Sequence, residues 1–230
     1  ATYNEVVYGP FTISNYVATL SATPASLNNT FTLVSTNSFK VSWDANGNPE
    51  YTEYKLHISG DPDFSTYSSF DVKTDSNTFP IIYTFISGLK PNYPYYARVY
   101  SINKDGITNS TAAYLGSKYT LADAPKDIRV TDVSLKGVSL EWDGGENSPL
   151  TIYQVRVTSV SFETPYVSTP IPFSQNYTDT QAFINGLWIN TTYWFEVTAR
   201  NMEGIPSPSI QTAEPILTPG VGDAPPSSIA

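Results

Sequence analysis

The sequence predicts an all-β chain of two tandem antiparallel β-sandwiches, and three observations support this prediction. The first is a repeat of about 100 residues, which is typical of an array of equal folding units. The second is a period of two in the apolar residues, which indicates half-buried strands. The third is the distribution of 18 prolines and 13 glycines, which interrupt the strands at short intervals.

The repeat is carried by residues that recur with their internal spacing kept. Trp43 and Tyr54 lie eleven residues apart, as do Trp142 and Tyr153. Further along, a longer set recurs in the same order: Leu89, Tyr95, Val99, Asn103 and Gly106 match Leu187, Tyr193, Val197, Asn201 and Gly204. A unit of about 100 residues can bury a core without disulfides or metals, and the chain contains no cysteine.

Alternating apolar and polar residues place the early strands of each unit. The segments 39–43, 54–58 and 138–142 all alternate in this way. Tyr, Thr, Val, Ile and Phe, the residues that pleated sheets favour, are abundant. We find no convincing amphipathic helix. Regularly spaced short strands in units of this size predict a β-sandwich.

These residues resemble the fibronectin type III module, with its Leu-x-Pro-x-x-x-Tyr-x-x-x-Val pattern, its following Asn-x-x-Gly and a Trp on an early strand. The first unit matches at Trp43, Leu89, Pro91, Tyr95, Val99, Asn103 and Gly106. The second matches at the same positions, except that Ile189 replaces the proline. The resemblance covers residues 23–219 and implies seven strands in two antiparallel sheets. It also implies that the hydroxyls of Tyr95 and Tyr193 bond to nearby backbone, as tyrosine corners do.

The repeat also divides the chain. We expect a C-terminal remnant of a preceding module in residues 1–22, fibronectin type III-like modules in 23–121 and 122–219, and a linker or the start of a following module in 220–230. The last expectation rests on Asp123-Ala124-Pro125, which recurs in residues 223–225. The junction at 121–125 contains proline and no Gly or Ser run, which predicts a stiff, rod-like pair of modules.

Charge and hydropathy exclude several classes of partner. The formal net charge is −9, and the 12 basic residues are scattered along the chain. Phosphate-binding surfaces need clustered Lys and Arg, so nucleic acid and anionic lipid are poor partners. No apolar run approaches the roughly 18 residues of a membrane span, so we expect no direct membrane insertion by this segment.

Candidate catalytic and metal-binding residues are few, and each has a structural explanation. His57 is the only histidine, lies on the outward parity of its strand and has no Gly-x-Ser-x-Gly elbow to serve. The loop that starts at Asp44 begins like an EF-hand, but Pro49 and Lys55 stand where that motif needs Gly and Glu. We therefore predict a protein without catalytic residues, cofactor or metal.

Outward-facing residues of the sixth strand are the main candidates for contact with a partner. The candidate contact residues are Tyr96, Arg98, Tyr100 and Trp194 on that strand, with Trp188 in the turn before it. The third strand adds Lys55 and His57, or Gln154 and Arg156, to the same face. Arginine between aromatic rings gains cation–π energy. The alternative is a self-supporting ladder of cross-strand pairs.

Four sequons mark candidate glycosylation sites: Asn28, Asn109, Asn176 and Asn190. A chain this rich in Asn, Ser and Thr is expected to contain about as many by chance. Their number is therefore no evidence of secretion.

Together, these features predict a non-catalytic structural and interaction segment of a long, modular extracellular or cell-surface protein, such as a spacer, adhesin or filament component. Its expected partners are neighbouring fibronectin-like modules or other protein subunits, with carbohydrate as a further candidate. Two alternatives stay open: an accessory module of a secreted polysaccharide-degrading enzyme, and a ligand-binding segment of a receptor ectodomain. Unpaired strand edges at the ends would favour strand addition from another chain.

Overall fold

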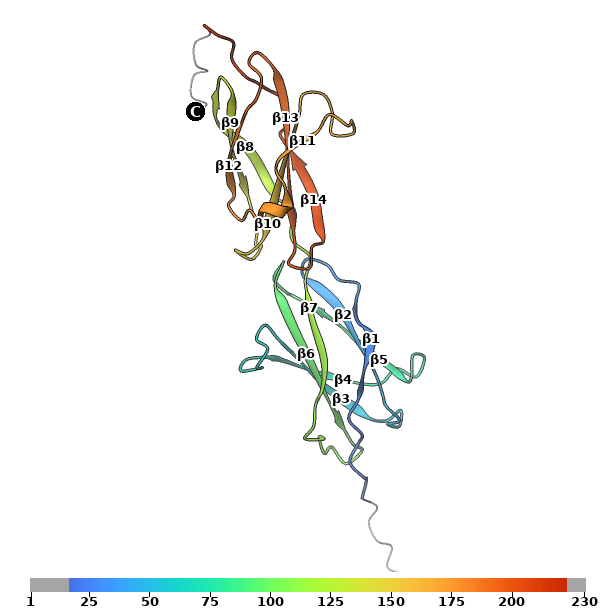
Figure 1. Ribbon diagram of the computed structural model, residues 1–230. Helices are drawn as coiled ribbons and strands as arrows, with labels where there is room; N and C mark the ends of the chain where they lie inside the picture. Colours follow the sequence, from blue (N-terminus) through green and yellow to red (C-terminus); the bar gives the residue numbers. More distant parts are fainter. Residues whose placement is uncertain (1–16, 223–230) are drawn as a thin grey trace, which may run out of the picture.

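The structure, a computed structural model, describes residues 17–222 as two β-sandwiches placed end to end (Figure 1). We call the first sandwich, strands β1 to β7, module 1 and the second, β8 to β15, module 2. Most of the expected remnant in residues 1–22 and of the expected module start in 220–230 lies outside the described residues.

Module 1 has the seven strands that the resemblance implies. They are β1 (Ala25–Thr32), β2 (Ser38–Asp44), β3 (Glu53–Ser59), β4 (Ser68–Val72), β5 (Ile81–Ser87), β6 (Pro94–Ile102) and β7 (Ala113–Tyr119). One sheet has the order β1-β2-β5 and the other β4-β3-β6-β7. All neighbouring strands are antiparallel. The all-β sandwich prediction is confirmed.

Module 2 repeats this plan, with an added 3-10 turn and a last strand in two parts. Its elements are β8 (Lys126–Ser134), β9 (Gly137–Asp143), β10 (Ile152–Thr158), β11 (Ser168–Ile171), a 3-10 turn at Phe173–Gln175, β12 (Gln181–Asn185), β13 (Thr192–Arg200), β14 (Pro206–Gln211) and β15 (Ile216–Leu217). The sheets are β12-β9-β8 and β11-β10-β13-β14, with β15 also paired to β13. The last strand is interrupted before Ile216, where Pro215 has no N–H to donate to a ladder.

Each module closes around its own tryptophan. Trp43 is fully buried and meets the ring of Tyr54 edge-on at 5.7 Å, and Trp142 meets Tyr153 in the same way at 5.5 Å. The two buried clusters share no residue. Burial raises the pKa of Tyr54 to about 12. Because the cores are separate, each module buries its apolar surface without help from the other.

A tyrosine at the start of the sixth strand of each module closes the preceding turn. The Tyr95 hydroxyl accepts a hydrogen bond from the backbone N–H of Lys90 at 2.8 Å. The Tyr193 hydroxyl accepts one from the N–H of Trp188 at 2.9 Å. Both tyrosine corners are therefore present. The turns that they hold carry the next residues of interest, Asn92 and its counterpart Asn190.

Candidate functional site

The junction between the modules is built around the turn that joins β13 to β14 in module 2. The side-chain oxygen of Asn201 accepts hydrogen bonds from the N–H groups of Glu203, at 3.1 Å, and Ile205, at 2.9 Å. An asparagine closes a turn well in this way. Its amide Nδ2 is left free to donate to the carbonyl of Thr120 in module 1, at 3.1 Å. One side chain thus shapes the turn and binds the other module.

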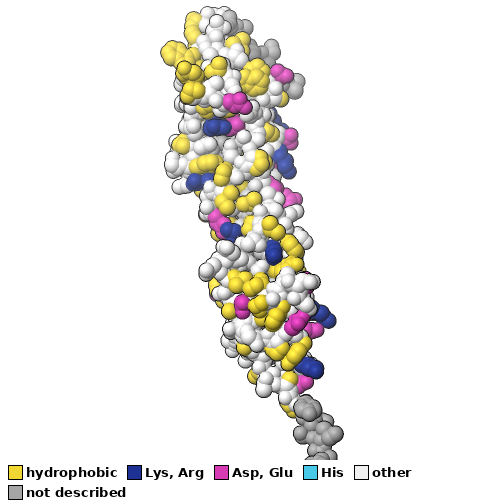
Figure 2. Space-filling model, turned by 90° about the vertical axis from the view of Figure 1, so that its right-hand side faces the viewer, with side chains coloured by type: hydrophobic (Ala, Val, Ile, Leu, Met, Phe, Trp, Pro, Cys, Tyr) yellow, Lys and Arg dark blue, Asp and Glu magenta, His cyan; other side chains and the backbone are white. Residues whose placement is uncertain are grey.

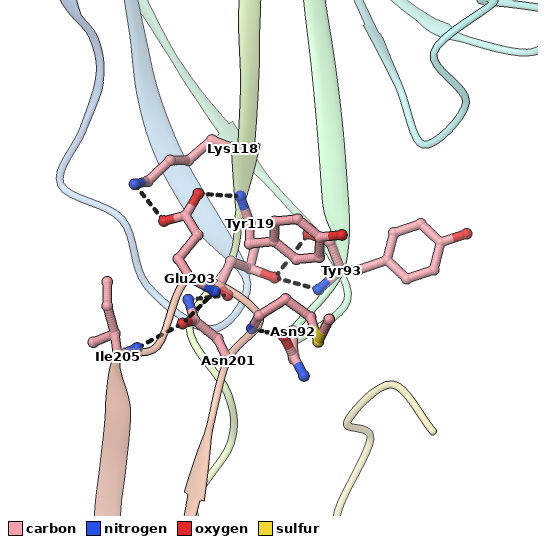
Figure 3. Close-up of polar contacts among 9 residues, drawn as sticks. Asn92, Tyr93, Lys118, Tyr119, Asn201, Glu203 and Ile205 are labelled. Carbon is pink, nitrogen blue, oxygen red and sulfur yellow. Dashed lines mark hydrogen bonds and ion pairs between the residues drawn. The ribbon is translucent and has the colours of Figure 1, made fainter. Parts of the chain in front are cut away.

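Asn92 makes the reciprocal contact from module 1. Its φ of 47° lies in the left-handed region, which asparagine tolerates better than most residues. The side chain donates to the Thr151 hydroxyl at 2.6 Å and accepts from the N–H of Met202 at 2.9 Å. Its backbone N–H donates to the carbonyl of Leu121 at 3.0 Å. Asn92 therefore binds module 2 at two points, and Figure 3 shows its contact with the turn that contains Asn201 and Glu203.

Glu203 adds a charged contact at the edge of the junction. Its Oε2 lies 2.5 Å from the Lys118 ammonium, and its Oε1 accepts from the N–H of Tyr119 at 3.1 Å (Figure 3). Both charged side chains are about three-quarters covered. Partial burial reduces the screening that makes most exposed ion pairs weak.

The linker itself is held by module 2. The N–H of Asp123 donates to Asn147 Oδ1 at 2.8 Å, and Asn147 Nδ2 donates back to the Asp123 carbonyl at 2.9 Å. The preceding residue, Ala122, is 2% exposed and belongs to the core of module 2. The linker is thus held by hydrogen bonds and core packing of module 2, in addition to the stiffness that its proline gives.

The polar groups at the centre of the junction are fully enclosed. Asn92 and Thr120 are 0% exposed, and Asn201 and Thr151 are 1% exposed. A buried amide or hydroxyl left without a partner costs about 1–3 kcal/mol. Here the two asparagines find partners across the junction, so their bonding is complete only in this one relative placement of the modules.

The outer face of the β3–β6 pair in module 1 carries the candidate contact residues, but they contact one another. The Arg98 guanidinium lies 4.3 Å from the Phe64 ring centroid and 5.6 Å from that of Tyr100. Tyr96, Arg98 and Tyr100 are all half-buried. The prediction that this face binds a partner stays untested, but the geometry favours a ladder that supports itself.

His57 was expected to be a surface histidine, and its exposure corrects that expectation. It lies on the outer face, as its parity predicted, yet it is only 7% exposed. The Tyr67 ring, from the loop after β3, stacks on it at 4.0 Å, and Arg98 Nε donates to its Nδ1 at 3.3 Å. Burial, followed by the charges of Arg98 and Lys55, lowers the pKa of His57.

The equivalent face of module 2 holds an ion pair. Glu196 is 3% exposed and accepts hydrogen bonds from Arg156, with Nε at 2.7 Å, and from Gln211 at 3.0 Å. Trp194 beside it is half-buried and lines a shallow pocket with Phe162. Of the five candidate contact residues, Trp188 alone is largely open, with 78% of its surface exposed.

The candidate glycosylation sites differ in access. Asn28, Asn176 and Asn190 are exposed. Asn109 is half-buried, and its Nδ2, the atom that would carry a glycan, donates to the Ser21 carbonyl at 2.8 Å. Asn109 is therefore the poorest acceptor of the four.

Sequence reasoning missed the polar residues that form the junction. Asn92, Asn147 and Glu203 were not singled out, and Asn201 was noted only as part of the repeat. A signal was present, because asparagine recurs five residues after each core tryptophan, at Asn48 and Asn147. It recurs again three residues after Leu89 and Leu187. A repeated polar residue at a turn indicates a repeated bonding role.

Within residues 17–222, no group of three or more His, Cys, Asp or Glu side chains is placed to hold a metal ion. Likewise, no helix in the described part of the chain has the length and apolar character needed to cross a membrane. Figure 2 shows one long face of the rod, on which charged and hydrophobic side chains are interspersed.

Comparisons with known proteins agree with this architecture. The family model of the fibronectin type III domain matches residues 22–114 and 123–214. Titin from Drosophila melanogaster is 27% identical over 186 residues, which cover 75% of this chain and 1% of titin. The solved two-domain fibronectin type III segment of chicken tenascin superposes with a TM-score of 0.55 at 16% identity, over 86% of this chain and all of that segment. The chain belongs to the fibronectin type III family, as two modules in tandem.

Proposed function

We propose that this chain is a non-catalytic spacer that holds neighbouring fibronectin type III modules of a larger protein in one fixed relative orientation. The observation that carries this proposal is Asn92, whose enclosed side chain bonds two different groups of the next module. If the two modules rotated freely about the linker, the Asn92 side chain could bond equally well to water, and these two bonds would not be needed.

The polypeptide path supports a fixed angle. Leu121 to Asp123 connect the modules, with Leu121 bonded to module 1 through Asn92 and Asp123 clamped to module 2 by Asn147. Little backbone is left to absorb a hinge motion, which normally needs several residues free to change their dihedral angles. Tension or bending is therefore passed from one sandwich to the next through the junction.

An extracellular or cell-surface setting is part of this proposal, in which the segment spaces and presents other modules. Cysteine-free modules stabilised by packing fold equally well in oxidising and reducing surroundings, so the fold is compatible with that setting. Accessibility of the protein to protease added outside intact source cells would test it, and complete protection in intact but not lysed cells would overturn it.

The orientation is tested by measuring residual dipolar couplings of both modules in one weakly aligned sample. We expect a common alignment tensor for both modules in the wild-type chain. In Asn92→Gly the tensors are expected to diverge, because the junction loses both side-chain bonds while glycine keeps the left-handed backbone.

The matched control is Asn190→Gly. Asn190 has a φ of 50° at the equivalent turn of module 2, but it is exposed and lies at the far end of the rod. This variant is expected to keep a common tensor. Independent tensors in the wild-type chain would overturn the proposed function.

A further inference from the structure

We propose that the end of module 1 that faces away from module 2, formed by the β6–β7 turn with Asn103, Lys104 and Asp105, docks another fibronectin type III module that joins it through residues 17–22. The docked geometry would be that of the junction already described. This inference deepens the proposed function, because it names a second partner for the same chain and the surface that receives it.

The first support is the path of the incoming segment. Asn103 Nδ2 donates to the Thr19 carbonyl at 3.1 Å, as Asn201 donates to the Thr120 carbonyl at 3.1 Å. Asp105 Oδ2 accepts from the N–H of Ala18 at 2.8 Å. In the other junction, Glu203 accepts in the same way from Tyr119, the residue before Thr120.

The second support is the linker clamp. Asn48 accepts from the N–H of Ala22 at 2.7 Å and donates to its carbonyl at 2.8 Å. Asn147 holds Asp123 by the same two bonds. Ala22 follows Thr19 by three positions, as Asp123 follows Thr120. The segment that enters module 1 therefore has the anchors and the length of the linker that joins the two modules.

The third support is what this end still lacks. In module 2, the N–H of Met202 and the hydroxyl of Thr151 are bonded by Asn92. Their counterparts in module 1 are the N–H of Lys104 and the hydroxyl of Thr52, and neither has a hydrogen-bond partner among residues 17–222. Lys104 is exposed, whereas Thr52 is 1% exposed and already enclosed. The Lys104 N–H is therefore the group that an asparagine of a further module would bond.

The group that would bond the Lys104 N–H indicates which partner fits this end. The partner must present a left-handed asparagine in the turn before its sixth strand, and a last strand that leads into Val17. Both modules of this chain carry such an asparagine, with φ of 47° at Asn92 and 50° at Asn190. A module of this same type is therefore the partner that the surface fits. In a copy of module 1, Lys118 would stand opposite Asp105, as it stands opposite Glu203 in the present junction.

The direct test is a chain with a second copy of residues 18–118 inserted after Lys118, so that Lys118 of the first copy is followed by Ala18 of the second. The insertion adds one whole module, and the separate cores indicate that modules can be combined as units. Asn92 of the first copy then faces Lys104 of the second across the new junction.

Segmental isotope labelling allows amide exchange of Lys104 to be read in each copy. In the second copy we expect exchange slowed about tenfold, the usual protection from one added hydrogen bond. Lys104 of the first copy gains no new module from the insertion and serves as the internal control. Asn92→Gly in the first copy alone is expected to restore fast exchange in the second.

Equal exchange in both copies, with an independent alignment tensor for the first module, would overturn this inference. The present junction between modules 1 and 2 would still show a common tensor in that case. Failure of the proposed function is a different result, namely loss of the common tensor across the present junction in the wild-type chain.

Discussion

The outer faces of the two modules differ in how they bury the cross-strand pair that contains an arginine. In module 1, His57 on β3 pairs with Arg98 on β6, and in module 2 Arg156 on β10 pairs with Glu196 on β13. These are equivalent positions in the repeat. Module 1 covers the pair with the aromatic rings of Tyr67 and Phe64. Module 2 uses an ion pair that Gln211 completes.

The two faces share one feature, a phenylalanine ring that lies over the arginine. The loop after the third strand brings Phe64 over Arg98 at 4.3 Å and Phe162 over Arg156 at 5.3 Å. The arginine has changed strands between the modules, while the ring that covers it has kept its place in the repeat. In both modules the ring covers an arginine, although the arginine lies on a different strand in each.

The largest effect is expected from Arg156→Met, which leaves the Glu196 carboxylate buried without its cation. Breaking a buried pair on one side typically costs about 3–5 kcal/mol. Denaturant unfolding followed through the Trp142 indole N–H resonance measures the loss in module 2. Adding Glu196→Leu should recover most of that stability, because a buried pair replaced on both sides is often neutral. An unstable double variant would show that the pair itself, and not the stranded charge, stabilises the face.

A smaller loss is expected from Arg98→Met at the face of module 1. The variant removes the contacts with the Phe64 and Tyr100 rings and the hydrogen bond to His57, but it strands no charge. The expected cost is about 1–2 kcal/mol. The Trp43 indole resonance reports the unfolding of this module. A loss of stability as large as that of Arg156→Met would contradict the expected difference between the two faces.

The smallest effect is a difference in pH dependence. The pKa of His57 is lowered in the folded state, so the unfolded chain binds the proton more readily. The stability that His57 contributes is therefore complete above its ordinary pKa of 6.5 and is lost as the pH falls below that value toward the folded pKa. Module 1 should lose stability as the pH falls below about 6.5, more than module 2, which has no histidine. In His57→Gln the two modules should respond alike, and a persistent difference would assign the effect to other groups.

Much of the fold could be predicted because it depends on periodic burial. The alternation around Trp43 and Trp142 predicts strands without any knowledge of contacts between the modules. The tyrosine corners follow from local spacing. The interruption before Ile216 is different. It follows from one proline in a strand that the repeat alone would have drawn as continuous.

The candidate site was harder to predict because its residues act across the junction. Asn92 and Asn201 appear in the sequence as ordinary turn residues, and only the stacking of the modules turns them toward each other. His57 was misjudged for a similar reason, since parity gives the face of a strand but not the loop that covers that face. Tyr67 reaches it from ten residues away.

The short linker also determines how the rod would respond to a pulling force. If the junction bonds of Asn92 and Asn201 break, the extension comes only from straightening residues 121–123, or about 10 Å of chain. Unfolding a module of about 100 residues would release roughly 300 Å. The junction can therefore yield and re-form within a very small change of length, while both sandwiches stay folded and their ends stay within reach of each other. Such a chain yields at the junction, where only Ala122 leaves the core of module 2, before either sandwich unfolds.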